Sequence, residues 1–151
     1  MDTRTRFLMK FREIGWEEFS KNREASWHSM FGIFLHILEV EESWLQFALQ
    51  GLSPADSPSL DPTEYNNFDL ITELNSRVSA RTISVLERLK DEDLSKEIAF
   101  RESSGITART TSRILMHAFV DEVAHVGELI CLLWQEDAKP PYIDWLDFQI
   151  E

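Results

Sequence analysis

The sequence predicts an all-α fold, a four-helix bundle with long crossover connections, formed by residues 1–151 as a single domain. Four segments repeat apolar residues every three or four positions, the period of an α-helix that buries one side. Stretches rich in Gly, Ser and Pro separate these segments. The chain has 151 residues, of which 43% are hydrophobic, so it can bury a core without disulfides. In such bundles, sites are built from inward side chains on facing helices.

The first half of the chain predicts two helices. A short helix is expected over residues 3–11, with a break at Gly15 and a further helical turn beyond it. A long helix is expected over residues 26–49, where Ser26 could cap the start and Gly51 is a stop signal. Because this long helix is apolar nearly all round, it should be central in the bundle or lie at a subunit interface.

A proline-rich and serine-rich stretch, residues 51–62, predicts a connection within the domain. The third long helix is expected over residues 69–89, with Asp69 as its cap. Residues 91–109 contain a short alternating piece, which predicts an extended excursion before the last helix.

The last long helix should start between residues 107 and 111 and end near Gln135, because the two prolines that follow cannot continue it. Cys131 lies within this helix among Leu and Ile, which predicts a small buried thiol. The aromatic end of the chain, residues 142–148, is expected to pack back on the bundle or on a partner subunit.

The charge of the chain excludes some classes of partner. The formal net charge is −12, whereas proteins that bind nucleic acids neutralise phosphates with clustered Lys and Arg, so no nucleic acid partner is expected. No apolar run reaches the ~20 residues that span a bilayer, and the N-terminus lacks the uninterrupted apolar core of a secretory signal. A cytoplasmic protein without a membrane segment is therefore expected.

The last helix carries ionisable residues on the side that should face the core, namely His117, Asp121, His125 and Glu128. Burying them is costly unless they pair with one another or hold a metal ion. Residues four apart can point at one ion, and His36, in the apolar helix, could complete a three-ligand site. His117 and His125 are ~12 Å apart along a helix, so only one of them can share an ion with Asp121. The spacing alone does not choose between them.

An ordinary structural interpretation competes with the metal site. A lone histidine on an apolar face, such as His36, is usually a hydrogen-bonded core residue, and Asp121 with His125 could be a simple hydrogen-bonded pair. Five other residues are expected to be structural, with Glu39, Glu41 and Glu42 on a solvated face and Trp44 and Trp134 as core or rim aromatics.

Two segments carry a resemblance to a known family. His-Ile-Leu-Glu-Val-Glu-Glu-Ser-Trp-Leu, which begins at His36, resembles the second-helix signature of the DinB/YfiT-like superfamily of metal-binding four-helix bundles. His-Ala-Phe-Val-Asp-Glu-Val-Ala-His-Val-Gly-Glu-Leu, which begins at His117, resembles its second signature, usually written His-x-x-x-His-x-x-x-His-Arg-Gly-Gln. The resemblance covers essentially the whole chain. The family is unrelated to the DNA polymerase of the same name.

This resemblance implies that His36, the residue at 121 and His125 bind one divalent metal ion, with His117 just outside the ligand set. The sequence departs from the family pattern at three positions: Asp121 replaces a histidine, Val126 an arginine and Glu128 a glutamine. Two histidines and one carboxylate still suit Zn²⁺, Ni²⁺ or Fe²⁺.

The resemblance also implies a function. Similar proteins include thiol-dependent transferases and isomerases, so a metal-dependent enzyme of this type, or a hydrolase, is expected to act on a small-molecule substrate with a low-molecular-weight thiol as a further cofactor. Glu128 could accept a hydrogen bond from a ligand or act as a base, and no other catalytic residue is indicated. A non-catalytic metal-binding stress or interaction protein is the competing expectation, and a plain helical bundle is the third. A homodimer is expected from the family and from the apolar second long helix.

Overall fold

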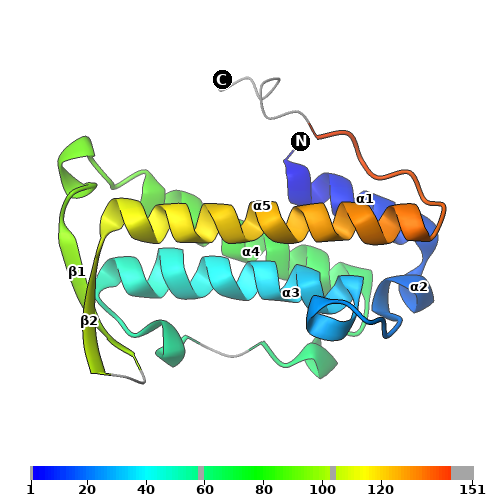
Figure 1. Ribbon diagram of the computed structural model, residues 1–151, viewed down its shortest axis with the longest axis horizontal. Helices are drawn as coiled ribbons and strands as arrows, with labels where there is room; N and C mark the ends of the chain where they lie inside the picture. The colour runs from blue at the N-terminus through cyan, green and yellow to red at the C-terminus, as the bar shows by residue number, and fades with distance from the viewer. Residues whose placement is uncertain (1, 58–59, 103–104, 144–151) are drawn as a thin grey trace.

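The computed structural model of the protein describes residues 2–57, 60–102 and 105–143. In this part of the chain, four long helices form a bundle with a short helix at one end and a β-hairpin at the other (Figure 1). The elements are α1 (Thr3–Ile14), α2 (Trp16–Ser20), α3 (Met30–Glu41), α4 (Phe68–Leu86), β1 (Glu97–Glu102), β2 (Gly105–Thr110) and α5 (Thr111–Gln135). The predicted all-α four-helix bundle is confirmed. No helix in the described ranges combines the length and the apolar character needed to cross a membrane.

The connection between α3 and α4 returns along the length of the bundle. As a result α3 and α4 run in the same direction, while α1 and α5 run in the opposite one (Figure 1). This is the predicted long crossover. The arrangement places α3 and α5 side by side and antiparallel, so that side chains from the two helices face each other along their length.

The start of α3 differs from the prediction. Ser29 caps the helix by accepting a hydrogen bond from the backbone N–H of Gly32, whereas Ser26 was expected to do so. Ser26–His28 forms a separate tight turn, because Trp27 and His28 both adopt positive φ, at 54° and 62°. The hydroxyl of Ser26 instead donates a hydrogen bond to the carboxylate of Glu128. Similarly, Asn67 rather than Asp69 caps α4, with its side chain accepting two backbone N–H groups.

Two glutamates near the end of α3 are buried, although a solvated face was expected there. Each finds a partner from a distant helix, since Glu41 pairs with Arg4 of α1 at 2.6 Å and Glu42 with Arg81 of α4 at 2.9 Å. Beyond Glu41 the chain continues as the π-helical segment Glu42–Phe47 and a 3₁₀ turn, so the helical path ends near residue 50, close to the predicted end.

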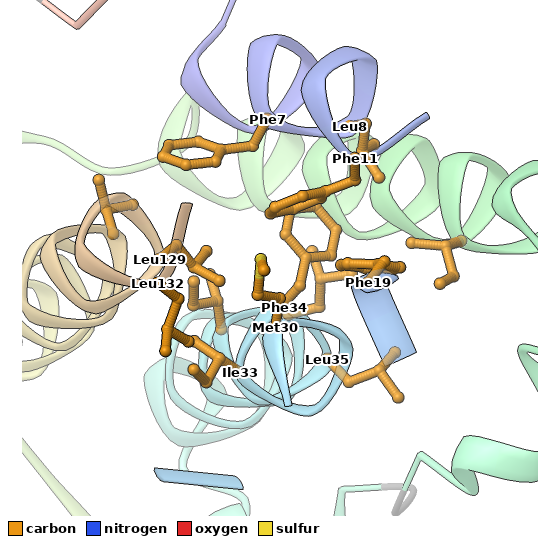
Figure 2. Packing of buried hydrophobic residues seen from close by; sticks show 14 of the residues in the cluster. Phe7, Leu8, Phe11, Phe19, Met30, Ile33, Phe34, Leu35, Leu129 and Leu132 are labelled. Atoms are coloured by element: carbon orange, nitrogen blue, oxygen red, sulfur yellow. The ribbon is translucent and has the colours of Figure 1, made fainter. Parts of the chain in front are cut away.

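Aromatic residues from successive helices form the centre of the core (Figure 2). The ring of Phe11 from α1 stacks on that of Phe19 from α2 at 4.4 Å and meets that of Phe34 from α3 edge-on at 5.9 Å. Leu129 of α5 packs against the same cluster. Full burial of one such side chain contributes about 1.5–3 kcal/mol. Because its apolar residues are buried within the chain itself, α3 is central in the bundle.

The hairpin confirms the predicted extended excursion. β1 and β2 pair antiparallel, with Glu97 opposite Thr110. Phe100 on β1 packs with Ala48 and Ile114 in a second small core. The hairpin therefore covers the end of the bundle where α5 begins (Figure 1).

The residues that follow α5 contact α1 and the core. Arg6 of α1 donates to the carbonyl oxygen of Tyr142 at 2.9 Å, and Ile143 packs against the core. The rest of the segment that was predicted to pack back on the bundle, 144–148, lies outside the described residues.

Cys131 is exposed, so the predicted buried thiol was wrong. The side of α5 that faces the core carries Val126, Leu129 and Leu133. Cys131 and Trp134 lie outside this stripe, and Trp134 is 58% exposed.

Candidate metal centre

Three side chains from α3 and α5 converge between the two helices. The Nε2 atom of His36 lies 3.6 Å from Oδ2 of Asp121, and Nε2 of His125 lies 3.9 Å from Oδ1 of the same carboxylate. The two imidazole rings meet edge-on with centroids 4.9 Å apart. One possible ligand atom from each residue lies within 4.8 Å of the other two. The structure thus brings together the three residues that the family resemblance implied as ligands.

These separations suit a shared ion better than direct hydrogen bonds. Hydrogen bonds between nitrogen and oxygen are at most about 3.2 Å long, whereas two atoms bound to one Zn²⁺ at about 2.1 Å lie about 3.4 Å apart at a tetrahedral angle. Within the described part of the chain, the buried atoms Nδ1 of His36 and Oδ2 of Asp121 have no hydrogen-bond partner. The donor set of two imidazoles and one carboxylate therefore fits a divalent ion.

The surroundings of His36 favour its neutral form, which is the form that binds metals. Burial lowers the pKa of His36, and the nearby His125 lowers it further, while the carboxylate of Asp121 opposes both effects without outweighing them.

Trp27 covers one face of His36. The two rings are stacked, with centroids 4.0 Å apart and planes 18° apart. This position depends on the positive φ of Trp27 and on Gly32, because a Cβ at residue 32 would collide with the carbonyl oxygen of Trp27. Glycine at this point of α3 is thus a requirement of the turn that carries the indole.

Glu128 joins this turn to the metal centre. Its carboxylate accepts hydrogen bonds from the backbone N–H of Ser26 at 2.8 Å, from the Ser26 hydroxyl and from Nδ1 of His125 at 3.2 Å. Burial raises the pKa of Glu128, but the hydrogen bonds from Ser26 and His125 outweigh it, so the pKa is lowered overall. The lowered pKa keeps Glu128 ionised, so its carboxylate accepts the N–H of a ligand histidine but is a weak base.

His117 lies one helical turn before Asp121 on α5 and is itself exposed. Its ring packs edge-on against Trp44, with centroids 4.6 Å apart. Trp44 is half-buried beside the second small core, as expected for a rim aromatic. His117 does not belong to the group of three converging residues, and its expected place next to the ligands stays a prediction.

Sequence reasoning missed Ser26 and Trp27 as parts of this site. Ser26 and Glu128 are 102 residues apart, so no local spacing reveals their contact. The stack of Trp27 on His36 depends on the positive φ of Trp27, which the apolar pattern of the helix does not indicate. The one available signal was Gly32, because a glycine inside an apolar helix indicates close approach of another backbone.

An antiparallel helix pair that presents two histidines and an aspartate, set in a four-helix bundle, defines a helical protein with a possible metal site. The model of the DinB family matches residues 2–150, and the chain belongs to this family. A relative in Bacillus subtilis (strain 168), the uncharacterized protein YizA, is 24% identical over 147 residues, which cover 87% of this chain and 88% of the relative.

Solved structures show the same fold. The DinB-like protein YjoA from Bacillus subtilis superposes with a TM-score of 0.67 at 19% identity, covering 93% of this chain and 90% of its own. A DinB-like protein from Bacillus cereus ATCC 10987 also gives a TM-score of 0.67, at 18% identity, covering 94% of this chain and 89% of its own.

Proposed function

We propose that the protein binds one divalent metal ion, Zn²⁺, Ni²⁺ or Fe²⁺, through His36, Asp121 and His125, and that it is a metal-dependent enzyme acting on a small molecule. The reaction class we propose is thiol-dependent transfer or isomerisation, or hydrolysis. The observation that carries the proposal is the convergence of three metal-binding side chains, among which the buried Oδ2 of Asp121 has no hydrogen-bond partner within the described residues.

Access to the site supports a catalytic role. The side chains of His36, Asp121 and His125 are 15%, 21% and 17% exposed, so a small molecule can reach them. Three protein ligands leave coordination positions open, as in catalytic rather than structural zinc sites. The bound ion would supply Lewis acidity that lowers the pKa of a thiol or a water molecule.

The chain's own residues then orient the site. Glu128 accepts the Nδ1–H of His125, which leaves Nε2 of that ring free to face the ion. Trp27 restricts the rotation of the His36 ring by stacking on it and shields one of its faces from water. Both contacts reduce the reorganisation that metal binding requires.

A non-catalytic role as a metal-binding stress or interaction protein is the second candidate. The stacking of Trp27 over His36 favours it, because an aromatic cover restricts access to the ion. The two functions differ in whether a coordination position stays open. In the Co²⁺-loaded protein, a small thiol such as 2-mercaptoethanol should change the visible absorption spectrum if the enzyme proposal holds, and an unchanged spectrum would favour the second candidate.

Elemental mass spectrometry on untagged protein tests metal binding. We expect near one equivalent in the wild type, loss in His36→Ala and retention in His28→Asn, a control at an exposed histidine whose positive φ asparagine also adopts. His117→Ala, in the same series, should retain the metal with reduced affinity. Absence of metal from the wild type, even after incubation with Zn²⁺, Ni²⁺ and Fe²⁺, would refute the site. Loaded protein should then be screened for thiol-transfer and hydrolytic reactions.

We also propose a homodimer, although not through α3, whose apolar residues are used inside the bundle. Exposed apolar residues lie on α5 instead, among them Met116 and Val120, at 59% and 53%. Light scattering should give twice the 17.6 kDa of one chain, and the double substitution of Met116 and Val120 by Glu should give one chain mass. A monomeric wild type would contradict the proposal.

A further inference from the structure

A cavity lies on the side of the α3 and α5 pair that faces away from the metal centre. Its volume is about 400 Å³, within the range of small-molecule sites, and its lining includes none of the three residues of the metal centre. The separation follows from helix geometry, because consecutive residues on a helix point about 100° apart. Asp121 thus faces His36, while Glu122 lines this cavity.

One end of the cavity is acidic. The guanidinium of Arg4 contacts Glu41 at 2.6 Å and Glu122 at 3.6 Å, and it donates to the hydroxyl of Ser79 at 3.1 Å. Asp2 lines the same end and caps α1 by accepting the backbone N–H of Thr5. Three carboxylates therefore surround one cation, and the cavity carries excess negative charge.

The charge of Glu41 is incompletely compensated. Its side chain is only 8% exposed, and within the described residues its Oε1 atom has no hydrogen-bond partner. Nη1 of Arg4, although close to Oε2, is not aligned for a hydrogen bond either. A buried carboxylate oxygen without a donor is costly, so the cavity is suited to a ligand that brings one.

Apart from Thr82, the rest of the lining is apolar, and the cavity is open at its rim. Ile37 of α3 lies deep in the cavity, while Ile83 of α4 and Phe119 of α5 are more than half exposed at its mouth. A ligand that fits must therefore combine a positively charged hydrogen-bond donor with an apolar body. An anion of the same shape would meet three carboxylates, and a neutral alcohol would bring no charge.

We propose that this cavity binds a small amphipathic cation, a protonated primary amine whose ammonium group donates to Oε1 of Glu41 and whose apolar chain lies against Ile37, Ile83 and Phe119. The site is independent of the metal centre and of the function proposed for it.

Calorimetry with n-hexylamine, 1-hexanol and hexanoate, three ligands of one chain length, tests the proposal on the full chain. We expect saturable binding of one hexylamine per chain, at least tenfold weaker binding of hexanol and none of hexanoate. Glu41→Gln should weaken hexylamine binding at least tenfold, whereas Glu39→Gln, the same change on α3 outside the lining, should leave it unchanged. Hexylamine should bind equally to His36→Ala, which separates this test from that of the metal centre.

A second variant guards against loss of fold in Glu41→Gln. Ile83→Lys adds a positive charge at an exposed rim position, so it should preserve the circular dichroism spectrum and still weaken hexylamine binding. The proposal is overturned if hexylamine does not bind saturably, if hexanol or hexanoate binds as well as the amine, or if neither variant changes its affinity.

Discussion

The indole of Trp27 stacks on the imidazole of His36, with ring centroids 4.0 Å apart and planes 18° apart. The two residues lie on different elements, a tight turn and the helix that follows it, so the stack joins the turn to the metal centre. Trp27 itself is 50% exposed. Its position is therefore set by the stack and the turn rather than by the core.

Removing this stack should weaken metal binding without unfolding the chain. Trp27→Ala frees the His36 ring to rotate, and we expect a loss of about tenfold in metal affinity, the scale seen for groups that orient metal ligands. Trp27→Phe retains an aromatic face and should lose less. Competition with a chromophoric chelator measures both, and Trp134→Ala, at another exposed indole, is the control. Equal affinity in all four proteins would show that the stack does not orient the ligand.

Gly32→Ala should destabilise the protein. The added methyl group collides with the carbonyl oxygen of Trp27, and relieving the clash requires a shift of the turn, at a cost of about 1–3 kcal/mol. Gly127→Ala is the matched control, because its Cβ meets nothing within 4 Å and alanine in a helix interior is favoured by about 0.5–1 kcal/mol. Urea unfolding should move the two midpoints in opposite directions. A stabilised Gly32→Ala would mean that the turn is not held in this position.

Glu128→Ala should lower metal affinity by about 10–100-fold, because Nδ1 of His125 loses its acceptor and the Ser26 turn loses its anchor. Glu128→Gln keeps an acceptor oxygen and should fall between the alanine variant and the wild type. Chelator competition again provides the measurement. An alanine variant with wild-type affinity would assign Glu128 a purely structural role.

The stability of the metal-free protein should fall in mild acid through His36. Burial lowers the pKa of His36 in the folded state below its ordinary value of 6.5, so between the two pKa values the unfolded chain binds more protons. The contribution is complete above 6.5 and is lost as the pH falls toward the folded-state pKa. Urea unfolding above and below 6.5 should therefore show a steeper loss for the wild type than for His36→Gln. Parallel losses would remove His36 as the cause.

Asp121→His should retain one equivalent of metal, because imidazole replaces carboxylate in a position already aimed at the other two ligands. Asp121→Ala should lose it. Elemental analysis of the two variants side by side separates the two outcomes, and loss of metal in both would show that the site accepts only a carboxylate at residue 121.

Local spacing was sufficient to predict the helices and to place Asp121 with His117 or His125 on one face of the last helix. The period of apolar residues located α3 and α5, and the four-residue step from Asp121 to His125 placed both on one face. The resemblance to the DinB family, rather than spacing, favoured His125 over His117. Spacing could not predict contacts between residues that are distant in the chain.

Glu41 and Glu42 illustrate this limit. Their neighbours in the sequence suggest a solvated face, and only the arginines on α1 and α4 make burial possible. Ser26 was likewise expected to cap a helix, because its contact with Glu128 of the last helix has no local signature. The exposure of Cys131 depends on which stripe of α5 faces the core, and its apolar neighbours on both sides left that open.

The crossover that makes α3 and α4 parallel belongs to a long stretch of chain that separates the metal-binding residue of α3 from those of α5. Between His36 and Asp121 stand α4 and the hairpin, so an ion shared by α3 and α5 would close a loop that contains both. Such an ion would stabilise the native state alone, because the unfolded chain does not bring the ligands together. Amide hydrogen exchange in α4 and the hairpin, which supply no metal ligand, should then slow when metal is added.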